Sequence, residues 1–235
     1  MKYAIIGAGG TGGCLGFFLE KAGKKTVVIP ILNIYGTGGR LQKKLPELTV
    51  SDGCIYVSAN ILEPGVILQH GKILRVVFGA RKPEEETEKM REVAKDMASD
   101  EMEVVLSENI RRDAMVKFSY VSPIGAAGLY CNAVAADFQR EGEQREMFKA
   151  LIREITALSH AMGIEFEEDL VERNLKILAS LSPEATTSMQ RDVMEGKRSE
   201  MDGLVYEVVR MGREYKVSMP QYEKAAACFR EQGIL

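Results

Sequence analysis

One lysine stands alone in the longest stretch of low charge in the sequence. Lys117 is the only charged residue between Asp113 and Asp137. Burying an ammonium group among apolar side chains costs free energy unless the group is paired, and partial desolvation lowers its pKa toward neutrality. A lysine of this kind can act as a general acid or stabilise a developing oxyanion. The alternative is a lysine whose ammonium group reaches solvent along its flexible stem, and spacing alone does not separate the two.

A second candidate site opens the chain. Gly7, Gly9 and Gly12 fit the spacing GxGxxG, with Gly10 and Thr11 between them. The first glycine allows a tight turn, the second lets a pyrophosphate approach the backbone, and the third lets a helix pack closely on a strand. Phosphates would then lie against the free N–H groups at the start of the helix. These residues predict a dinucleotide-binding turn, and a purely structural glycine turn is the alternative.

The residues that would distinguish NAD from NADP are missing from the expected place. An NAD site has Asp or Glu at the end of the second strand, roughly 20 residues after the glycine turn. Here that strand ends at Val28-Ile29-Pro30, with neither an acid nor an arginine. The residues that are present therefore select neither cofactor.

The elements that must position these residues begin with alternating strands and helices. A strand at Lys2–Ile6, the glycine turn, a helix to about Ala22 and a strand at Thr26–Ile29 form the first half of a dinucleotide-binding unit. The next part is rich in strands and contains one charged helix. Its expected elements are strands within Thr49–Ile61 and Val66–Gly79, a turn at His70-Gly71-Lys72, a helix from Pro83 to about Met97, and a strand at Met102–Leu106.

From Ser107 onward the sequence predicts helices alone. Ser107 can cap a helix that carries Lys117, and Pro123 should kink or end that helix. Apolar residues that recur at intervals of three and four predict further helices at Glu143–Met162, Glu167–Leu181, Ser188–Glu195, Ser199–Tyr215 and Gln221–Arg230. We therefore expect an α/β fold: a Rossmann-type N-terminal domain at residues 1–107, followed by an all-helical domain at residues 108–235 for substrate binding or dimerisation.

Composition narrows the class of protein. The 235 residues are 46% hydrophobic and 28% charged, which excludes a disordered tail. A formal charge of −3 without a basic cluster argues against nucleic acid as a partner. Four scattered cysteines and two histidines suggest reduced thiols in a cytoplasmic protein and no metal site. The low-charge stretch around Lys117 is expected to be a buried helix and no membrane span.

Several motifs in this order resemble one known family. The segment Asp113-Ala114-Met115-Val116-Lys117-Phe118 resembles its lysine motif, and Pro30-Ile31-Leu32-Asn33 is similar to a strand end that carries its asparagine. The strand residues Tyr56–Ser58, Glu63–Val66 and Arg75–Gly79 look like its later sheet. The most specific match is the set Ser188-Met189, Asp192, Gly196-Lys197, Glu200 and Asp202. Together these motifs resemble the ketopantoate reductase (2-dehydropantoate 2-reductase) family.

The resemblance implies NADPH-dependent reduction of 2-dehydropantoate or a similar 2-oxo acid to the 2-hydroxy acid, as in pantothenate biosynthesis. It implies that Lys117 is the general acid and that Glu200 orients the lysine or binds a substrate hydroxyl. Ser188 would hold the substrate carboxylate, Asn33 would position cofactor and substrate, and the glycine turn would bind NADP. Without the resemblance, Glu200 is a solvated helix residue, Ser188 a helix N-cap and Asn33 a strand-end turn residue. A homodimer is one option for assembly.

The sequence departs from the family pattern in two places. Family members carry several strands and helices between the second strand and the asparagine strand, whereas here Ile29 runs directly into Pro30. Parallel neighbours need a crossover of a dozen or more residues, so about one mononucleotide-binding half is absent from the sequence. Val121 and Gly125 stand where the best-known members have asparagines. These departures leave two alternatives: a catalytically dead or weakened remnant that acts as a helical dimerising module, and a reductase of another branched 2-oxo acid.

Overall fold

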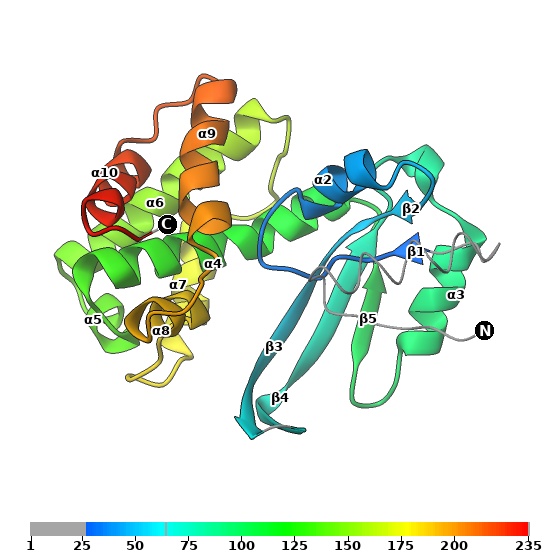
Figure 1. Cartoon of the computed structure of the whole chain (residues 1–235), viewed down its shortest axis with the longest axis horizontal. Coiled ribbons are helices and arrows are strands. Elements are labelled where there is room, and N and C mark those ends of the chain that lie inside the picture. The colour runs from blue at the N-terminus through cyan, green and yellow to red at the C-terminus, as the bar shows by residue number, and fades with distance from the viewer. Residues whose placement is uncertain (1–26, 64, 235) are drawn as a thin grey trace. The chain divides into compact units, whose positions relative to one another are not determined.

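The computed structural model describes residues 27–63 and 65–234, and it divides the chain into two compact units (Figure 1). The first unit is Met1–Ala114 and the second is Met115–Leu235. The first unit contains strands and helices, and the described part of the second contains helices alone. This is the α/β fold with a helical C-terminal part that the sequence predicts.

The described part of the first unit begins with a parallel pair of strands connected through a helix. Strand β1 (Val27–Val28) leads to helix α2 (Thr37–Lys44), which returns the chain to strand β2 (Thr49–Val50). Val27 pairs with Thr49 and Val28 with Val50 in parallel register. The predicted strand at Thr26–Ile29 is thus present over its described central residues, and a helical crossover satisfies the geometry that parallel neighbours require.

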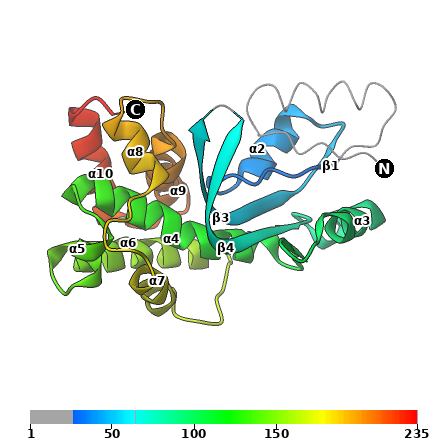
Figure 2. The same cartoon turned by 90° about the horizontal axis from the view of Figure 1, so that it is seen from below.

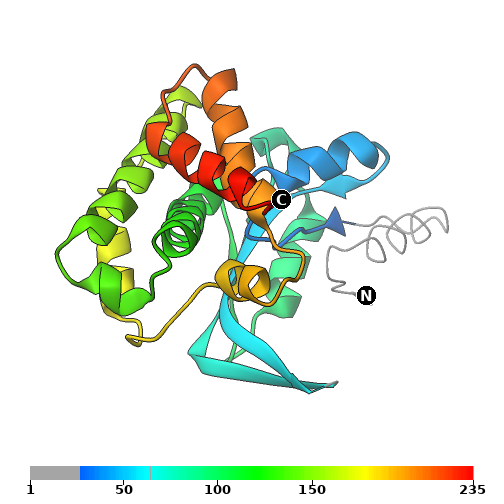
Figure 3. The same cartoon turned by 60° about the vertical axis from the view of Figure 1, so that its left-hand side comes forward.

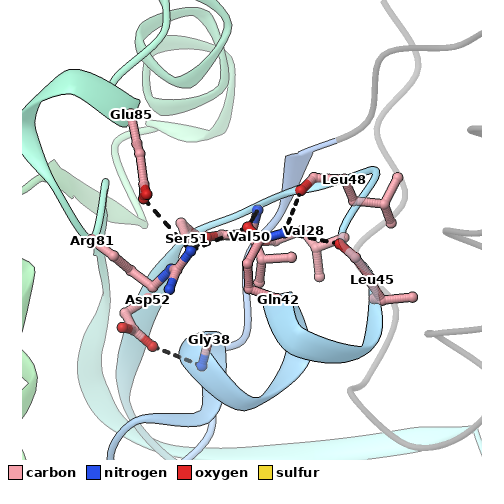
Figure 4. A network of polar contacts seen from close by, with 10 residues as sticks. All are labelled: Val28, Gly38, Gln42, Leu45, Leu48, Val50, Ser51, Asp52, Arg81 and Glu85. Atoms are coloured by element: carbon pink, nitrogen blue, oxygen red, sulfur yellow. Dashed lines mark hydrogen bonds and ion pairs between the residues drawn. The ribbon is translucent and has the colours of Figure 1, made fainter.

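Two side chains tie this small unit together (Figure 4). Gln42 on α2 donates through Nε2 to the carbonyl oxygens of Leu45, at 2.9 Å, and Leu48, at 2.8 Å. Its Oε1 accepts from the backbone N–H of Val50 at 3.2 Å and from Arg81 at 3.2 Å. Arg81 also donates through Nε to the Val50 carbonyl at 3.0 Å. The Gln42 amide thus donates two hydrogen bonds and accepts two, which is all that it can form. Gln42 and Arg81 together hold the turn from α2 into β2.

A three-stranded mixed sheet follows. Strand β3 (Asp52–Glu63) is antiparallel to β4 (Val66–Gly79), and β4 is parallel to β5 (Glu103–Leu106). Between β4 and β5 lie a short 3-10 turn, η1 (Pro83–Glu85), and helix α3 (Glu88–Met97). Pro83 therefore opens a separate turn, and the charged helix itself begins five residues later than the sequence suggests. Helix α3 packs Met90 and Val93 against Val76 and Phe78 of the sheet.

The predicted turn at His70-Gly71-Lys72 is wrong. Glu63 pairs with Val66, so the chain reverses between those two residues, where Gly65 has a φ of 86°. Strand β4 continues through Gly71, whose φ of 74° accompanies a register shift in the pairing with β3. Gly65 and Gly71 each lie in a segment that could form the turn. Reversal of the chain just before Val66 lets β3 and β4 pair over more residues than a reversal at Gly71 would. Gly71 serves as a β-bulge in a continuing strand.

The second unit is a bundle of helices (Figures 2 and 3). Helix α4 begins in the first unit and continues through the second. Helix α6 contacts α5, α7, α9 and α10, so it lies at the centre of the packing. The elements are α4 (Ile110–Cys131), α5 (Ala135–Gln139), α6 (Glu143–Ala161), α7 (Leu170–Ala179), α8 (Ser188–Met194), the π-helical turn η2 (Asp202–Tyr206), α9 (Glu207–Glu214) and α10 (Pro220–Glu231).

The start of α4 corrects one prediction. Asn109, rather than Ser107, caps the helix, because its Oδ1 accepts from the backbone N–H of Arg112 at 3.2 Å. Ser107 instead accepts from the N–H of Asn109 at 3.0 Å and donates to the Asp113 carboxylate at 2.6 Å. Ser107 thus holds the capping residue Asn109 in place from two residues before it. Over the described residues, no helix combines the length and apolar character that crossing a membrane would require.

Candidate active site

Lys117 lies in the first half of α4, where the helix becomes buried. Its side chain is half-buried, whereas Met115 and Phe118 beside it have exposed fractions of 0% and 2%. From Ser122 to Gly128 every residue of α4 is buried. The structure therefore places Lys117 at the edge of an apolar helix core, and half-burial of the side chain fits both interpretations of this lysine.

The sequence predicts that Pro123 kinks or ends the helix; it lies inside α4 and does not end it. A proline has no N–H, so the carbonyl of Ser119, four residues earlier, loses its helical partner. Asn174 on α7 replaces that partner: its Nδ2 donates to the Ser119 carbonyl at 2.8 Å and to Ser119 Oγ at 3.1 Å. Both side chains are fully buried. A distant amide thus keeps α4 continuous past its proline.

Ser122 connects α4 to the segment that follows Glu200. Its Oγ donates to the carbonyl of Leu204 at 2.6 Å and lies 2.6 Å from the hydroxyl of Tyr222 on α10. Ser122 is five residues after Lys117, and Leu204 is four residues after Glu200. The elements that carry the predicted general acid and the predicted glutamate therefore meet within two helical turns of both residues.

Glu200 lies two residues before a π-helical turn. The N–H of Leu204 bonds to the Glu200 carbonyl at 2.9 Å in the ordinary helical pattern, whereas the N–H of Glu207 reaches five residues back to the Asp202 carbonyl. The sequence predicts one continuous helix over Ser199–Tyr215, so this turn was missed. Single π turns often lie at functional sites, because the extra residue re-aims the side chains around it. Glu200 is half-buried, which fits both the active-site glutamate and the solvated residue of the alternative.

The side chain of Asp202, in the same turn, is clamped by an arginine. The guanidinium group of Arg210 donates to both carboxylate oxygens, at 2.9 and 3.0 Å, across an interval of eight residues. It also donates to Glu207. A bidentate pair of this kind constrains geometry more than a single contact does. The π turn after Glu200 is thus held from its exposed side as well as from Ser122.

Ser188 is the first residue of α8 and has an exposed side chain. The alternative in which Ser188 is the N-cap is wrong, because Thr187 caps the helix and accepts from the N–H of Gln190 at 3.2 Å. Two glycines of α4 receive the next two side chains of α8. A Cβ at Gly125 would lie 2.8 Å from Met189 Cε, and one at Gly128 would lie 2.6 Å from the Gln190 amide.

This close packing against α4 fixes the position of the first turn of α8, which begins at Ser188. Gln190 is 5% exposed, and its Nε2 donates to the Ala133 carbonyl at 2.8 Å just beyond α4. The first turn of α8 is therefore docked against α4 by the two side chains that follow Ser188. The structure brings together, around α4, the elements that carry Lys117, Glu200 and Ser188.

Asn33 belongs to the other unit. It lies in the loop between β1 and α2 and is half-buried. In α/β folds, ligands bind outside the carboxyl ends of parallel strands, and Asn33 follows the carboxyl end of β1. The five predicted cofactor-binding residues, Gly7, Gly9, Gly10, Thr11 and Gly12, lie outside the residues that the structure describes.

Sequence reasoning missed four features that shape this site: Ser122, Asn174, Tyr222 and the π turn. One signal was available for the first, since Ser119 and Ser122 interrupt an otherwise apolar stretch of α4. Buried hydroxyl groups need partners, so their presence indicates neighbouring polar groups. The identity of those partners could not be predicted, because Asn174 and Tyr222 lie 55 and 100 residues further along the chain.

Comparison with solved structures supports this fold. The chain superimposes with a TM-score of 0.80 on 2-dehydropantoate 2-reductase from Methylococcus capsulatus, at 21% identity, covering 98% of this chain and 72% of that one. A dimeric ketopantoate reductase from Staphylococcus aureus gives 0.75 at 18% identity, covering 88% of this chain and 68% of that one. D-Mandelate dehydrogenase in complex with NADH gives 0.76 at 17% identity, covering 93% and 74%. Identities this low show a shared fold.

Sequence comparison identifies the family. The 2-dehydropantoate 2-reductase of Mesorhizobium japonicum is 26% identical over 207 residues, which are 86% of this chain and 61% of that protein. The chain thus spans less than two thirds of the length of that relative. The family model described as the C-terminal part of ketopantoate reductase PanE/ApbA matches residues 109–232. That match covers more than half of the 235 residues and includes Lys117, Ser188 and Glu200. The chain is therefore a member of the ketopantoate reductase family of oxidoreductases.

Proposed function

We propose that this protein reduces a 2-oxo acid to the 2-hydroxy acid with NADPH, and that 2-dehydropantoate is its substrate, as in pantothenate biosynthesis. The observation that carries the proposal is the grouping around α4. Lys117 lies on α4, and α4 contacts the π turn that follows Glu200 through Ser122 and the helix that begins at Ser188 through Gly125 and Gly128. The family match over the same residues supports these roles.

The residues present fit a nicotinamide cofactor at one point of the described structure. Asn33 follows β1 at the carboxyl end of the parallel pair with β2, the edge at which α/β folds bind nucleotides. We propose that Asn33 orients the nicotinamide and the substrate, and that residues 7, 9, 10, 11 and 12 bind the phosphates. When bound, the reduced nicotinamide supplies the hydride for the carbonyl carbon.

The residues of the helical unit would manage the oxygen side of the reaction. As the carbonyl carbon gains a hydride, negative charge develops on the carbonyl oxygen, and Lys117 Nζ donates a proton to it. Glu200 would orient the ammonium group or accept a hydrogen bond from a substrate hydroxyl. The exposed hydroxyl of Ser188 would donate to the substrate carboxylate. Together these groups hold the 2-oxo acid in one orientation, which is where much of an enzyme's rate advantage originates.

Replacing Lys117 by alanine tests this assignment. General acid catalysis contributes about 100- to 10,000-fold, so kcat with 2-dehydropantoate should fall by about that factor in Lys117→Ala. The measurement is the loss of reduced-nicotinamide absorbance, with NADPH and NADH compared in parallel. Lys176→Ala, which removes an exposed lysine from α7, is the matched control and should leave turnover unchanged. Full turnover in Lys117→Ala would refute the assignment.

The same titrations decide between an enzyme and a remnant. Binding of NADPH only at millimolar concentration, or no binding, would favour a catalytically dead helical module. Saturable binding at micromolar concentration together with turnover would favour the reductase. If NADH supports turnover better than NADPH, the chain resembles in this respect the D-mandelate dehydrogenase crystallised with NADH.

A second candidate substrate is a 2-oxo acid with a wholly apolar side chain. Val121 and Gly125 follow Lys117 at intervals of four residues, on the same side of α4. The nearest group to a Cβ at Gly125 is the apolar Met189 Cε at 2.8 Å, with Thr187 Oγ1 further away at 3.9 Å. Comparing kcat/KM for 2-dehydropantoate with that for 2-oxo acids without a hydroxyl group decides between the two substrates.

We also propose that the protein forms a homodimer in the cytoplasm. The solved Staphylococcus aureus relative is described as dimeric. Sedimentation of the purified chain over a range of concentrations tests the assembly, and cell fractionation tests the location.

A further inference from the structure

A buried chain of hydroxyl groups connects α4, α10 and the π turn after Glu200. Ser122 and Tyr222 are fully buried, and Leu204 is 1% exposed. Ser122 Oγ lies 2.6 Å from the Leu204 carbonyl and 2.6 Å from Tyr222 OH. Buried hydroxyl groups with such short contacts form strong, geometrically restricted hydrogen bonds.

The direction of both hydrogen bonds follows from counting protons. A carbonyl oxygen can only accept, so the one proton of Ser122 is committed to Leu204. The Tyr222 hydroxyl must then donate to Ser122 Oγ. Burial raises the pKa of Tyr222, so its phenol keeps the proton that this arrangement requires. The resulting chain, from Tyr222 through Ser122 to Leu204, has a single orientation.

Tyr222 is itself held at both ends. The carboxylate of Glu154 on α6 accepts from the backbone N–H groups of Gln221, at 2.7 Å, and Tyr222, at 3.1 Å. A carboxylate in this position caps the first turn of α10 and interacts favourably with the positive end of the helix. The backbone of Tyr222 is thus attached to α6 and its side chain to α4.

The π turn needs an external support of this kind. A π turn replaces the tight i to i+4 pattern with a wider one, which is rare because it packs the backbone less well. Here the Leu204 carbonyl, in the middle of the turn, accepts a hydrogen bond from the Ser122 hydroxyl on another helix. The turn is therefore pinned at its centre from the buried side, while Arg210 holds Asp202 on the exposed side.

We propose that Ser122 and Tyr222 are positioning residues that hold the π turn and, through it, Glu200. The inference rests on the proposed function in so far as Glu200 acts on the substrate. Neither hydroxyl needs to contact the substrate, because each acts through the Leu204 carbonyl. Loss of the Tyr222 hydroxyl leaves Ser122 with an unfilled acceptor and loosens its hold on the turn.

Two measurements on Tyr222→Phe test the proposal. The first is amide hydrogen exchange of residues 203–207 in the full chain. One lost hydrogen bond shifts a local equilibrium by about tenfold, so exchange there should speed up by about that factor. The second is the split between kcat and KM: kcat should fall by about tenfold with KM little changed, because the hydroxyl does not bind substrate.

The chain offers a matched control on α4 itself. The hydroxyl of Tyr120 is buried and has no hydrogen-bond partner among the described residues. Tyr120→Phe therefore removes the same atom without removing a hydrogen bond, and it should change neither exchange at residues 203–207 nor turnover. Ser122→Ala should show a larger effect than Tyr222→Phe, and Ser122→Thr, which keeps the hydroxyl, should restore most of the loss.

The outcomes separate this inference from the proposed function. Unchanged exchange at residues 203–207 in Tyr222→Phe overturns it, whatever the activity. Faster exchange with unchanged kcat in an active enzyme also overturns it, because the turn would then move without affecting catalysis. If the unsubstituted chain reduces no 2-oxo acid, the proposed function fails, and exchange alone decides whether the two hydroxyls hold the turn.

Discussion

Replacing Asn174 by leucine is expected to destabilise the helical unit, because it removes the partner of a buried carbonyl. In the native structure Asn174 Nδ2 lies 2.8 Å from the Ser119 carbonyl, which Pro123 deprives of its helical donor. A buried acceptor left without a partner costs about 1–3 kcal/mol. Asn174 Oδ1 is itself buried with no hydrogen-bond partner among the described residues, and leucine removes that unfavourable group. We therefore expect a net loss of about 1–2 kcal/mol in the free energy of unfolding.

A double-mutant cycle with Pro123→Ala isolates the carbonyl. Alanine at position 123 restores an N–H that can donate to Ser119 in the ordinary helical pattern. Asn174→Leu should then cost about 1 kcal/mol less in the Pro123→Ala background than in the native one, because the carbonyl has a second donor. The assay is urea unfolding followed by helical circular dichroism, with linear extrapolation to zero urea.

The result that refutes this reasoning is simple additivity. If Asn174→Leu costs the same in both backgrounds to within about 0.3 kcal/mol, Asn174 does not substitute for the missing proline N–H. Asn109→Leu provides the control: it removes an asparagine that caps the start of α4, fourteen residues before Pro123. Its effect should be additive with that of Pro123→Ala.

Two further predictions concern pH and packing. Burial raises the pKa of Glu154 above its ordinary value of 4.5, so the folded state binds its proton more tightly than the unfolded state. The stability that the Glu154 carboxyl contributes is complete below pH 4.5 and is lost as the pH rises through its raised pKa. In Glu154→Gln the decline of stability with pH should be flatter, measured as urea midpoints across that pH range. Gly128→Ala should destabilise by about 1–3 kcal/mol because its Cβ would meet the Gln190 amide at 2.6 Å and disrupt a buried hydrogen bond. Gly39→Ala on α2, whose Cβ would have Arg81 Nη1 at an ordinary contact distance of 3.9 Å, should not; equal midpoints for the two would contradict the packing argument.

The elements that the sequence predicts well are those whose stability is local. Helix α6 occupies Glu143–Ala161, against a prediction of Glu143–Met162, because its apolar residues recur along one face over five turns. The same holds for α10, which begins at a proline. In such helices the pattern that buries one face is contained in the segment itself.

The elements that were predicted wrongly depend on distant partners. Pro123 reads as a helix end until Asn174, 55 residues after Ser119, satisfies the carbonyl of Ser119 that the proline leaves free. The hairpin turn between Glu63 and Val66 could not be distinguished from one at Gly71, because both segments contain a glycine that tolerates positive φ. Over so few residues the apolar spacing of a π turn is the same as that of an α-helix, so the pattern does not distinguish them. The hydrogen bond that supports the turn comes from Ser122, which is distant in the sequence.

The contacts around α4 also define the side on which Lys117 lies. At about 100° per residue, Gly125 is about 80° around the helix from Lys117, Ser122 about 140° and Ser119 about 200°. Those three positions meet α8, the π turn with α10, and α7, respectively. Lys117 therefore lies outside the arc that these neighbours cover, with Val121 about 40° away between Lys117 and Gly125. If Lys117 protonates a 2-oxo acid as proposed, Val121 is the neighbouring position one turn further along the same side of α4, and a larger side chain there should change which 2-oxo acids are reduced.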